Sequence, residues 1–113
     1  MKIQSSILEN EVFFVNYKNL SSDELKQLIK NNKNMLLIDV RTEEEFEKVN
    51  IETAINIPLQ NLLYDLDDLQ DYIDKDIVIY CRSGHRSVTA CNLLSIEGFN
   101  NLYNLEYGIE SYF

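Results

Sequence analysis

The sequence has little glycine, proline, cysteine or tryptophan. Its 113 residues include three glycines, one proline, two cysteines and no tryptophan. So few glycines and prolines exclude a flexible linker or a low-complexity segment, and the length suits one domain around one hydrophobic core. Two cysteines cannot form the disulfide framework of a small secreted domain, so Cys81 and Cys91 are expected to be reduced.

Positive charge is also scarce. The chain has 10 Lys and Arg against 19 Asp and Glu, a formal net charge of −9. The lysines are scattered, which argues against a nucleic-acid partner. Apolar runs such as MLLIDV are far shorter than the ~20 residues of a membrane span, and no signal region is evident at the start. We therefore expect a cytoplasmic protein with no nucleic-acid or membrane partner, present as a monomer or a weak homo-oligomer.

Alternating strand and helix patterns predict an α/β fold. Buried strands are predicted at residues 35–40, 54–59 and 76–80, with a short strand ahead of Ser21 and a last one in NLYNLEYG. The pairs Ser21 and Glu24, and Thr42 and Glu45, have the spacing of helix capping boxes, so a helix is expected to begin at each. Short connections between such elements predict a mainly parallel sheet with helices on both faces.

Two more helices are predicted in the second half of the chain. Four apolar residues recur at helical spacing within residues 59–73: Leu62, Leu66, Leu69 and Ile73. They predict one amphipathic helix against the sheet. The aspartates on its other side lack the pattern of a calcium loop, so we interpret them as a solvated face. Residues 87–98 predict a helix that Gly98 ends. Residues 1–14 show no period and are assigned to an N-terminal extension of unknown role, ahead of a domain at 15–113.

The arginines gather around one cysteine. Seven lysines are spread along the chain, whereas the three arginines, Arg41, Arg82 and Arg86, all fall at predicted carboxyl ends of strands. The single histidine, His85, lies in the same run, YCRSGHRS. Ligands of open α/β sheets bind beyond the carboxyl ends of the strands, which is where Cys81 is expected.

The loop after Cys81 has the composition of an anion-binding turn. Ser83 and Gly84, between a buried strand and a helix start, let several backbone N–H groups point at one position. These amides, the helix dipole and the nearby Arg82 and Arg86 favour a thiolate, so we predict that Cys81 is a nucleophile at neutral pH. The alternative is an inert core thiol, sealed in the protein interior.

Three other residues carry separate predictions. The fork of Arg41 suits bidentate contact with an oxyanion, or with a carboxylate that braces the loop. His85 either tunes the thiolate, contacts the substrate or is an idle solvated residue. Cys91 shares a helical stripe with Val88 and Leu94, which favours a buried structural thiol over a resolving one.

With this loop, the chain resembles a single-domain rhodanese of the thiosulfate sulfurtransferase family, from about Leu20 to Tyr112. The resemblance lies in the ordered segments LIDVRTEEEF, AINIPL, DIVIYCRSGHRS, LLSIEGF and LYNLEYGI. It implies a rhodanese-like single domain with a five-stranded parallel sheet and helices on both faces. It also implies no metal and no organic cofactor, with a covalent persulfide on Cys81 as the intermediate.

The resemblance assigns roles as well. Cys81 resembles the nucleophile that takes the outer sulfur from a small sulfur-containing anion such as thiosulfate. Cyanide, a thiol or a sulfur-acceptor protein then removes that sulfur. The implied substrate-binding loop comprises Arg82, Ser83, Gly84, His85, Arg86 and Ser87. Its two arginines attract the anionic donor or brace the loop, and Asp39 and Arg41 are implied to support the site.

Two alternative functions and two departures accompany the resemblance. The alternatives are a non-turnover persulfide carrier or protein-interaction module, and a phosphatase or arsenate reductase. The latter enzymes use Cys-x5-Arg, whereas Cys81 and Arg86 form Cys-x4-Arg, which favours sulfur. The departures are VNIETA at 49–54, where many relatives have Gly-His-Ile-Pro-Gly-Ala, and Tyr107-Gly108 in place of Gly-Gly. The helix after Gly108 is expected to be short or missing.

Overall fold

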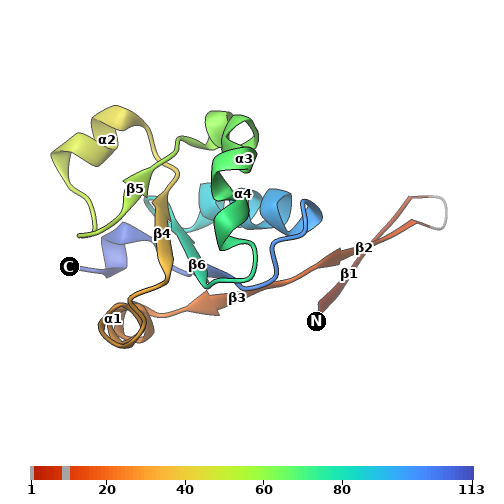
Figure 1. Cartoon of the computed structure of the whole chain (residues 1–113), viewed down its shortest axis with the longest axis horizontal. Coiled ribbons are helices and arrows are strands. Elements are labelled where there is room, and N and C mark those ends of the chain that lie inside the picture. The colour runs from red at the N-terminus through yellow and green to blue at the C-terminus, as the bar shows by residue number, and fades with distance from the viewer. Residues whose placement is uncertain (1, 9–10) are drawn as a thin grey trace.

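A parallel sheet forms the centre of the molecule (Figure 1). The computed structural model describes the backbone of residues 2–8 and 11–113 and the side chains of residues 16–113. The sheet has five strands in the order β3-β7-β6-β4-β5, all paired in parallel. Their bounds are β3 Tyr17–Leu20, β4 Leu36–Asp39, β5 Ile55–Asn56, β6 Ile77–Tyr80 and β7 Leu102–Leu105. The predicted five-stranded parallel sheet is confirmed.

The α-helices of the described chain are α1 Ser22–Asn31, α2 Glu43–Lys48, α3 Leu66–Leu69 and α4 His85–Ile96. Both predicted capping boxes are present, one between Ser21 and Glu24 and the other between Thr42 and Glu45. Gly98 ends α4 as predicted, with φ +97°. The start of α4 lies earlier than predicted, because Gly84 with φ +108° occupies its N-cap position.

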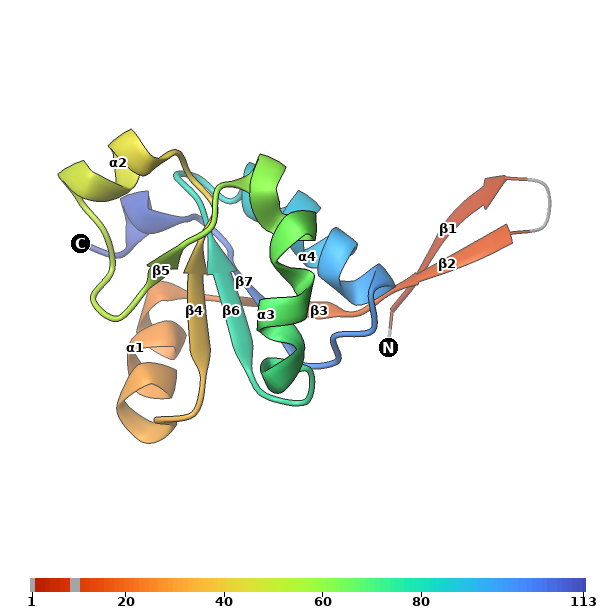
Figure 2. The same cartoon turned by 45° about the horizontal axis from the view of Figure 1, so that its top comes forward.

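Alternating side chains of the central strand β6 enter two separate cores. Ile77 and Ile79 pack with Cys91 on one face, and Val78 and Tyr80 pack on the other face with residues of α1. In Figure 2, α1 covers one face of the sheet while α3 and α4 cover the other. All four residues of β6 are buried. A strand that is covered on both faces has no solvent-facing positions, which explains why its sequence does not alternate between apolar and polar residues.

The single amphipathic helix predicted over residues 59–73 is wrong. The segment is a 3-10 helix at Leu59–Asp65, then the one-turn α3, then a 3-10 turn at Gln70–Tyr72. Leu62 and Leu69 are buried as the pattern requires. Each has another leucine three positions before it, a repeat that a 3-10 turn aligns on one side, and no side chain caps the start of any of the three pieces.

The N-terminal region forms a separate two-stranded antiparallel sheet. Strands β1 (Lys2–Leu8) and β2 (Glu11–Val15) pair with each other and project from the body of the molecule (Figures 1 and 2). The chain then enters the main sheet through Asn16, whose backbone N–H donates to Ser95 Oγ at 3.0 Å. Among the helices of residues 2–8 and 11–113, none has the length and apolar character needed to cross a membrane.

Candidate functional site

The cysteine loop connects the end of β6 to the start of α4 and is held from behind by the chain after β7. Ile109 N–H donates to Cys81 O at 2.9 Å, and Glu110 N–H donates to Arg82 O at 3.2 Å. These donors belong to a 3-10 turn, Ile109–Ser111, which agrees with the prediction of a short final helix. Gly108 precedes the turn at φ +67°, and a Cβ there would overlap the carbonyl group of Arg82. A glycine is therefore required at this second position of the Tyr-Gly pair.

Polar groups of the loop surround the thiol. Gly84 N–H donates to Cys81 Sγ at 3.1 Å, and the Ser87 hydroxyl lies 3.4 Å from the same sulfur. Burial acts to raise the pKa of the Cys81 thiol, but the Ser87 hydroxyl and the amides of Ser87, Gly84 and Ser83 act to lower it, and the lowering prevails. The loop therefore favours the thiolate, in the direction that the sequence predicts.

Cys81 is nevertheless enclosed, with 1% of its surface exposed. This burial by itself fits the alternative of an inert core thiol. Cys91 provides the comparison, because it is also closed to solvent and, among the described residues, its thiol makes only a long contact of 3.7 Å to Tyr103 O. Burial raises the pKa of Cys91 to about 12. Low exposure alone therefore does not decide the state of a thiol, and the polar neighbours of Cys81 are what distinguish it from Cys91.

Gly84 is what allows the loop to approach the thiol so closely. Its backbone adopts φ +108°, and a Cβ on this residue would overlap the carbonyl oxygen of Glu106. Only glycine adopts this conformation without strain while leaving room for the neighbouring chain. The prediction that Ser83 and Gly84 form a turn with inward-facing amides agrees with this geometry.

Both loop arginines contact carboxylates. Arg86 donates to Glu45 on α2 through two nitrogens, at 2.9 and 3.0 Å, and this hydrogen bonding is the main reason that the pKa of Glu45 falls to about 2. Arg82 Nε donates to Glu110 at 3.1 Å, on the surface. Of the two roles considered for these arginines, the observed contacts are those of residues that brace the loop.

Asp39 and Arg41 form a buried ion pair at the end of β4. Arg41 lies 2.7 Å from the Asp39 carboxylate, and the exposed fractions of the two side chains are 4% and 0%. A second hydrogen bond runs from the Arg41 guanidinium to Val49 O at 2.6 Å, so the pair holds the segment that follows α2. Arg41 thus makes carboxylate contact, one of the two contacts predicted for its fork.

The VNIETA turn forms without the glycines of the family pattern. Ala54 N–H donates to Ile51 O at 3.0 Å and closes the turn. Thr53 takes the left-handed conformation, with φ +75°, which a β-branched residue adopts only under strain. Ile51 N–H is in turn held by the buried Tyr80 hydroxyl at 3.1 Å.

His85 lies apart from the sulfur. Its ring is exposed, and its Nδ1 lies 3.1 Å from Ser83 Oγ. Among the described residues it makes no hydrogen bond to Cys81, so its contact with the site is through the loop serine.

Sequence analysis missed Asn104, on the neighbouring strand β7. Its side chain is 1% exposed and accepts a hydrogen bond from the Ser87 hydroxyl at 2.5 Å. Its amide nitrogen donates to Asn19 Oδ1 at 3.0 Å. An asparagine inside an apolar strand is disfavoured unless its amide is paired, which was the available signal.

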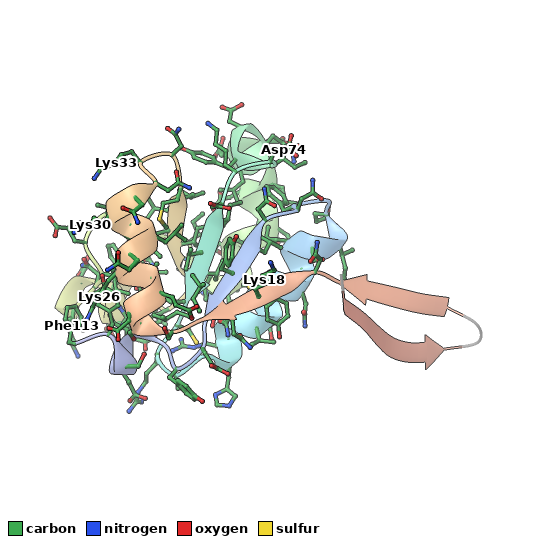
Figure 3. All side chains as sticks on the ribbon, turned by 90° about the horizontal axis from the view of Figure 1, so that it is seen from below. Lys18, Lys26, Lys30, Lys33, Asp74 and Phe113 are labelled. Atoms are coloured by element: carbon green, nitrogen blue, oxygen red, sulfur yellow. The ribbon has the colours of Figure 1, made fainter. Side chains whose placement is uncertain are left out.

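A cleft of about 560 Å³ opens beside the loop. Its lining residues are Arg41, Glu45, Lys48, Val49, Arg82, Ile109, Glu110 and Phe113. Other lysines lie elsewhere: Figure 3 shows Lys26 and Lys30 on α1 and Lys33 just beyond its end. Within the described chain, no group of three or more His, Cys, Asp or Glu side chains is arranged to hold a metal ion.

Comparison with known proteins gives consistent matches over this region. The model of the rhodanese-like domain family matches residues 21–113. A curated sulfurtransferase of Allochromatium vinosum is 34% identical over 90 residues, which cover 80% of this chain and 82% of that protein. A tRNA uridine(34) hydroxylase of Buchnera aphidicola is 32% identical over 97 residues, but the match covers only 31% of that protein.

Solved structures show the same architecture. The crystal structure of a rhodanese-like domain protein from Staphylococcus aureus superposes with a TM-score of 0.77 and 28% identity, over 85% of this chain and 91% of that one. A rhodanese-related protein from Thermoplasma volcanium gives a TM-score of 0.74 and 31% identity, over 85% and 90% of the two chains.

Proposed function

Because the chain belongs to the rhodanese-like domain family, we propose that it moves a sulfane sulfur from thiosulfate or another donor to a nucleophilic acceptor through a persulfide on Cys81. Sulfur transfer as a general activity is supported by the similarity to a sulfurtransferase over most of both chains. The observation that carries the proposal is the amide and hydroxyl contacts of the Cys81 sulfur, which favour its thiolate.

The first half-reaction loads the sulfur. The Cys81 thiolate attacks the outer sulfur of thiosulfate, a new S–S bond forms at Sγ, and the donor S–S bond breaks with its electron pair leaving on sulfite. The product is a Cys81 persulfide whose negative charge lies on the outer sulfur. The N–H groups of Ser83, Gly84 and Ser87 face Sγ and stabilise the attacking thiolate, and the turn that carries them is the nearest set of donors to the charge on the outer sulfur.

The second half-reaction unloads it. Cyanide or a thiolate attacks the outer sulfur, the persulfide S–S bond breaks, and its electron pair returns to Sγ as the thiolate. Both reactants are proposed to enter through the cleft beside the loop, which has the basic side chains of Lys48 and Arg82 in its wall. Because Cys81 is 1% exposed, each attack requires a small outward displacement of the loop.

Intact-protein mass spectrometry tests the proposal. On incubation with thiosulfate, the wild-type protein is expected to gain the mass of one sulfur atom, and cyanide is expected to remove it. Cys81→Ser should gain none, whereas Cys91→Ala should load like the wild type, because Cys91 lies in the core with its pKa raised to about 12. A wild-type protein that stays unmodified with thiosulfate and with protein persulfide donors would reject sulfur transfer.

The enclosure of Cys81 favours a second candidate, a persulfide carrier with little turnover on free thiosulfate. A partner protein that opens the loop would then deliver or remove the sulfur. Fast transfer from a protein persulfide with slow loading by thiosulfate would select this function. Phosphatase chemistry is disfavoured, because the guanidinium of Arg86 is already engaged by both oxygens of Glu45 and is not free to bind a phosphate.

A further inference from the structure

A chain of hydrogen bonds connects the buried thiol to Asn19, an exposed residue of the edge strand β3. Asn104 Nδ2 donates to Asn19 Oδ1 at 3.0 Å, which leaves Asn104 Oδ1 as an acceptor facing Ser87. The Ser87 hydroxyl donates to that oxygen at 2.5 Å and lies 3.4 Å from Cys81 Sγ. Ser87 is fully buried and Asn104 is 1% exposed, so bulk water does not replace either partner.

The Ser87 hydroxyl has one proton and two acceptors that compete for it. While Cys81 is a thiol, its S–H can donate to Ser87 Oγ, and the Ser87 proton remains on Asn104. When Cys81 ionises, the sulfur becomes an acceptor, and the hydroxyl must turn toward it to stabilise the charge. This rotation leaves Asn104 Oδ1 buried without a donor, which is unfavourable.

We propose that Asn104 is a positioning residue: by competing for the Ser87 proton it limits the stabilisation of the free Cys81 thiolate, and it thereby favours the persulfide. The part concerning the persulfide rests on the proposed function. In the thiolate the negative charge is on Sγ itself. In the persulfide Sγ is a neutral bridging sulfur and the charge is on the outer sulfur, so the hydroxyl can return to Asn104.

Asn104 therefore opposes the free thiolate but not the loaded state. A thiolate that is less stabilised is also the stronger nucleophile, because nucleophilicity rises with the thiol pKa. Both effects promote sulfur loading.

The other ionisable groups around the thiol are left in place when Asn104 or Ser87 is replaced. They are Arg82, His85, Arg86 and Cys91 on the loop and α4, Asp39 at the end of β4 and Arg41 after it, Glu45 on α2, Glu106 and Tyr107 after β7, and Glu110 in the final turn. Within the described chain, none of these side chains hydrogen-bonds the side chain of Ser87 or Asn104. The variants below therefore change one competing acceptor and leave this charge environment in place.

The test is the titration of Cys81 in Asn104→Leu, which has a similar volume but no acceptor. Thiolate formation is followed by ultraviolet absorbance and by the rate of iodoacetamide alkylation at the Cys81 peptide. Cys91 does not interfere, because its pKa is raised to about 12. The midpoint is expected at a pH lower than in the wild type by roughly 0.5–1 unit, the size expected for one hydrogen bond gained by the thiolate. Asn104→Ala removes the same acceptor and adds no larger side chain, so it replaces the leucine variant in the titration if that variant does not fold.

A double-mutant cycle separates this effect from a general loosening of the loop. In a Ser87→Ala background, Asn104→Leu should leave the midpoint unchanged, because the shared proton is gone. An unchanged or higher midpoint in Asn104→Leu, or the same downward shift with and without Ser87, would overturn the proposal.

Sulfur loading is scored separately. At a pH where both proteins are ionised, the variant should hold severalfold less persulfide at equilibrium with thiosulfate and sulfite. Equal or greater loading would refute the second half of the proposal. If the wild type forms no persulfide with any donor, the proposed function fails, and the titration still decides whether Asn104 acts on the thiol.

Discussion

Replacing Gly108 by alanine should displace the backbone of the cysteine loop at Arg82 and Ser83 without a direct contact with the thiol. The added methyl group would overlap Arg82 C and O and would lie 2.6 Å from Ser83 N. All three are backbone atoms, so no side-chain rotation relieves the overlap. The cysteine loop and the turn at Ile109–Ser111 would have to move apart, and the hydrogen bonds from Ile109 to Cys81 and from Glu110 to Arg82 would lengthen or break.

The expected cost follows from these contacts. A non-glycine residue in this region of backbone space costs roughly 1–3 kcal/mol, of which about 0.4–1 kcal/mol is returned by the lower entropy of the unfolded chain. Two weakened hydrogen bonds add about 1–3 kcal/mol. The variant should therefore lose roughly 3 kcal/mol of unfolding free energy, which lowers Tm by about 12 °C for a domain near 100 residues.

Gly98→Ala is the matched control. Gly98 also has a positive φ, +97°, but the nearest atom to a Cβ there is Ile73 Cδ1 at an ordinary 3.9 Å. This variant carries the backbone strain without the overlap and lies at the opposite end of α4 from the thiol. It should lose about 1 kcal/mol, or about 4 °C in Tm, and should load sulfur normally.

Thermal unfolding and persulfide mass are measured for both variants, with loading assayed well below each Tm. Gly108→Ala is expected to load sulfur at least tenfold more slowly than Gly98→Ala, because the amides that face Sγ move with the loop. A Gly108→Ala protein with the Tm and loading rate of the Gly98→Ala control would refute the argument that Gly108 determines the position of the loop.

Two further predictions concern the loop's supports. Thr53→Gly should raise Tm by about 4 °C. The strain relieved at φ +75° exceeds, by about 1 kcal/mol, the free energy lost because glycine gives the unfolded chain more conformational entropy. A lower Tm would contradict the strain at Thr53. Glu45→Gln retains the capping box but loses the charge that pairs with Arg86. Because the pKa of Glu45 is lowered from 4.5 to about 2, the wild type should exceed this variant in stability above pH 4.5, and the advantage should vanish as the pH falls toward 2. For this partly exposed pair the difference is about 1 kcal/mol, and urea unfolding across that range that shows a constant difference would exclude the ion pair as its source.

Local patterns predicted most of the elements correctly. Capping depends on residues three apart, so the starts of α1 and α2 were visible as Ser21 with Glu24 and Thr42 with Glu45. Buried strands were visible as apolar runs, because such a run also consists of neighbours along the chain. The failure at residues 59–73 has a physical cause: leucines that face a sheet satisfy α and 3-10 geometry equally, and spacing alone does not separate them.

The contacts of the arginines could not be read from spacing. Arg86 on α4 meets Glu45 on α2 across 41 positions of sequence, and Asn104 on β7 meets Ser87 on α4. Such pairs depend on strand order, β7 beside β6 and β6 beside β4. From the sequence, each arginine could contact either an oxyanion or a carboxylate. The fold places a carboxylate beside each of them.

The order of elements, the turn chemistry of Ser83 and Gly84 and the position of Cys81 at the end of a buried strand were determined by the sequence itself, because each depends on neighbours along the chain. The tertiary structure alone decided how deeply Cys81 lies, which carboxylate holds each arginine, and which acceptor shares the proton of Ser87. These properties depend on groups that folding brings together from distant strands and helices, where burial strengthens every hydrogen bond and penalises every unpaired one.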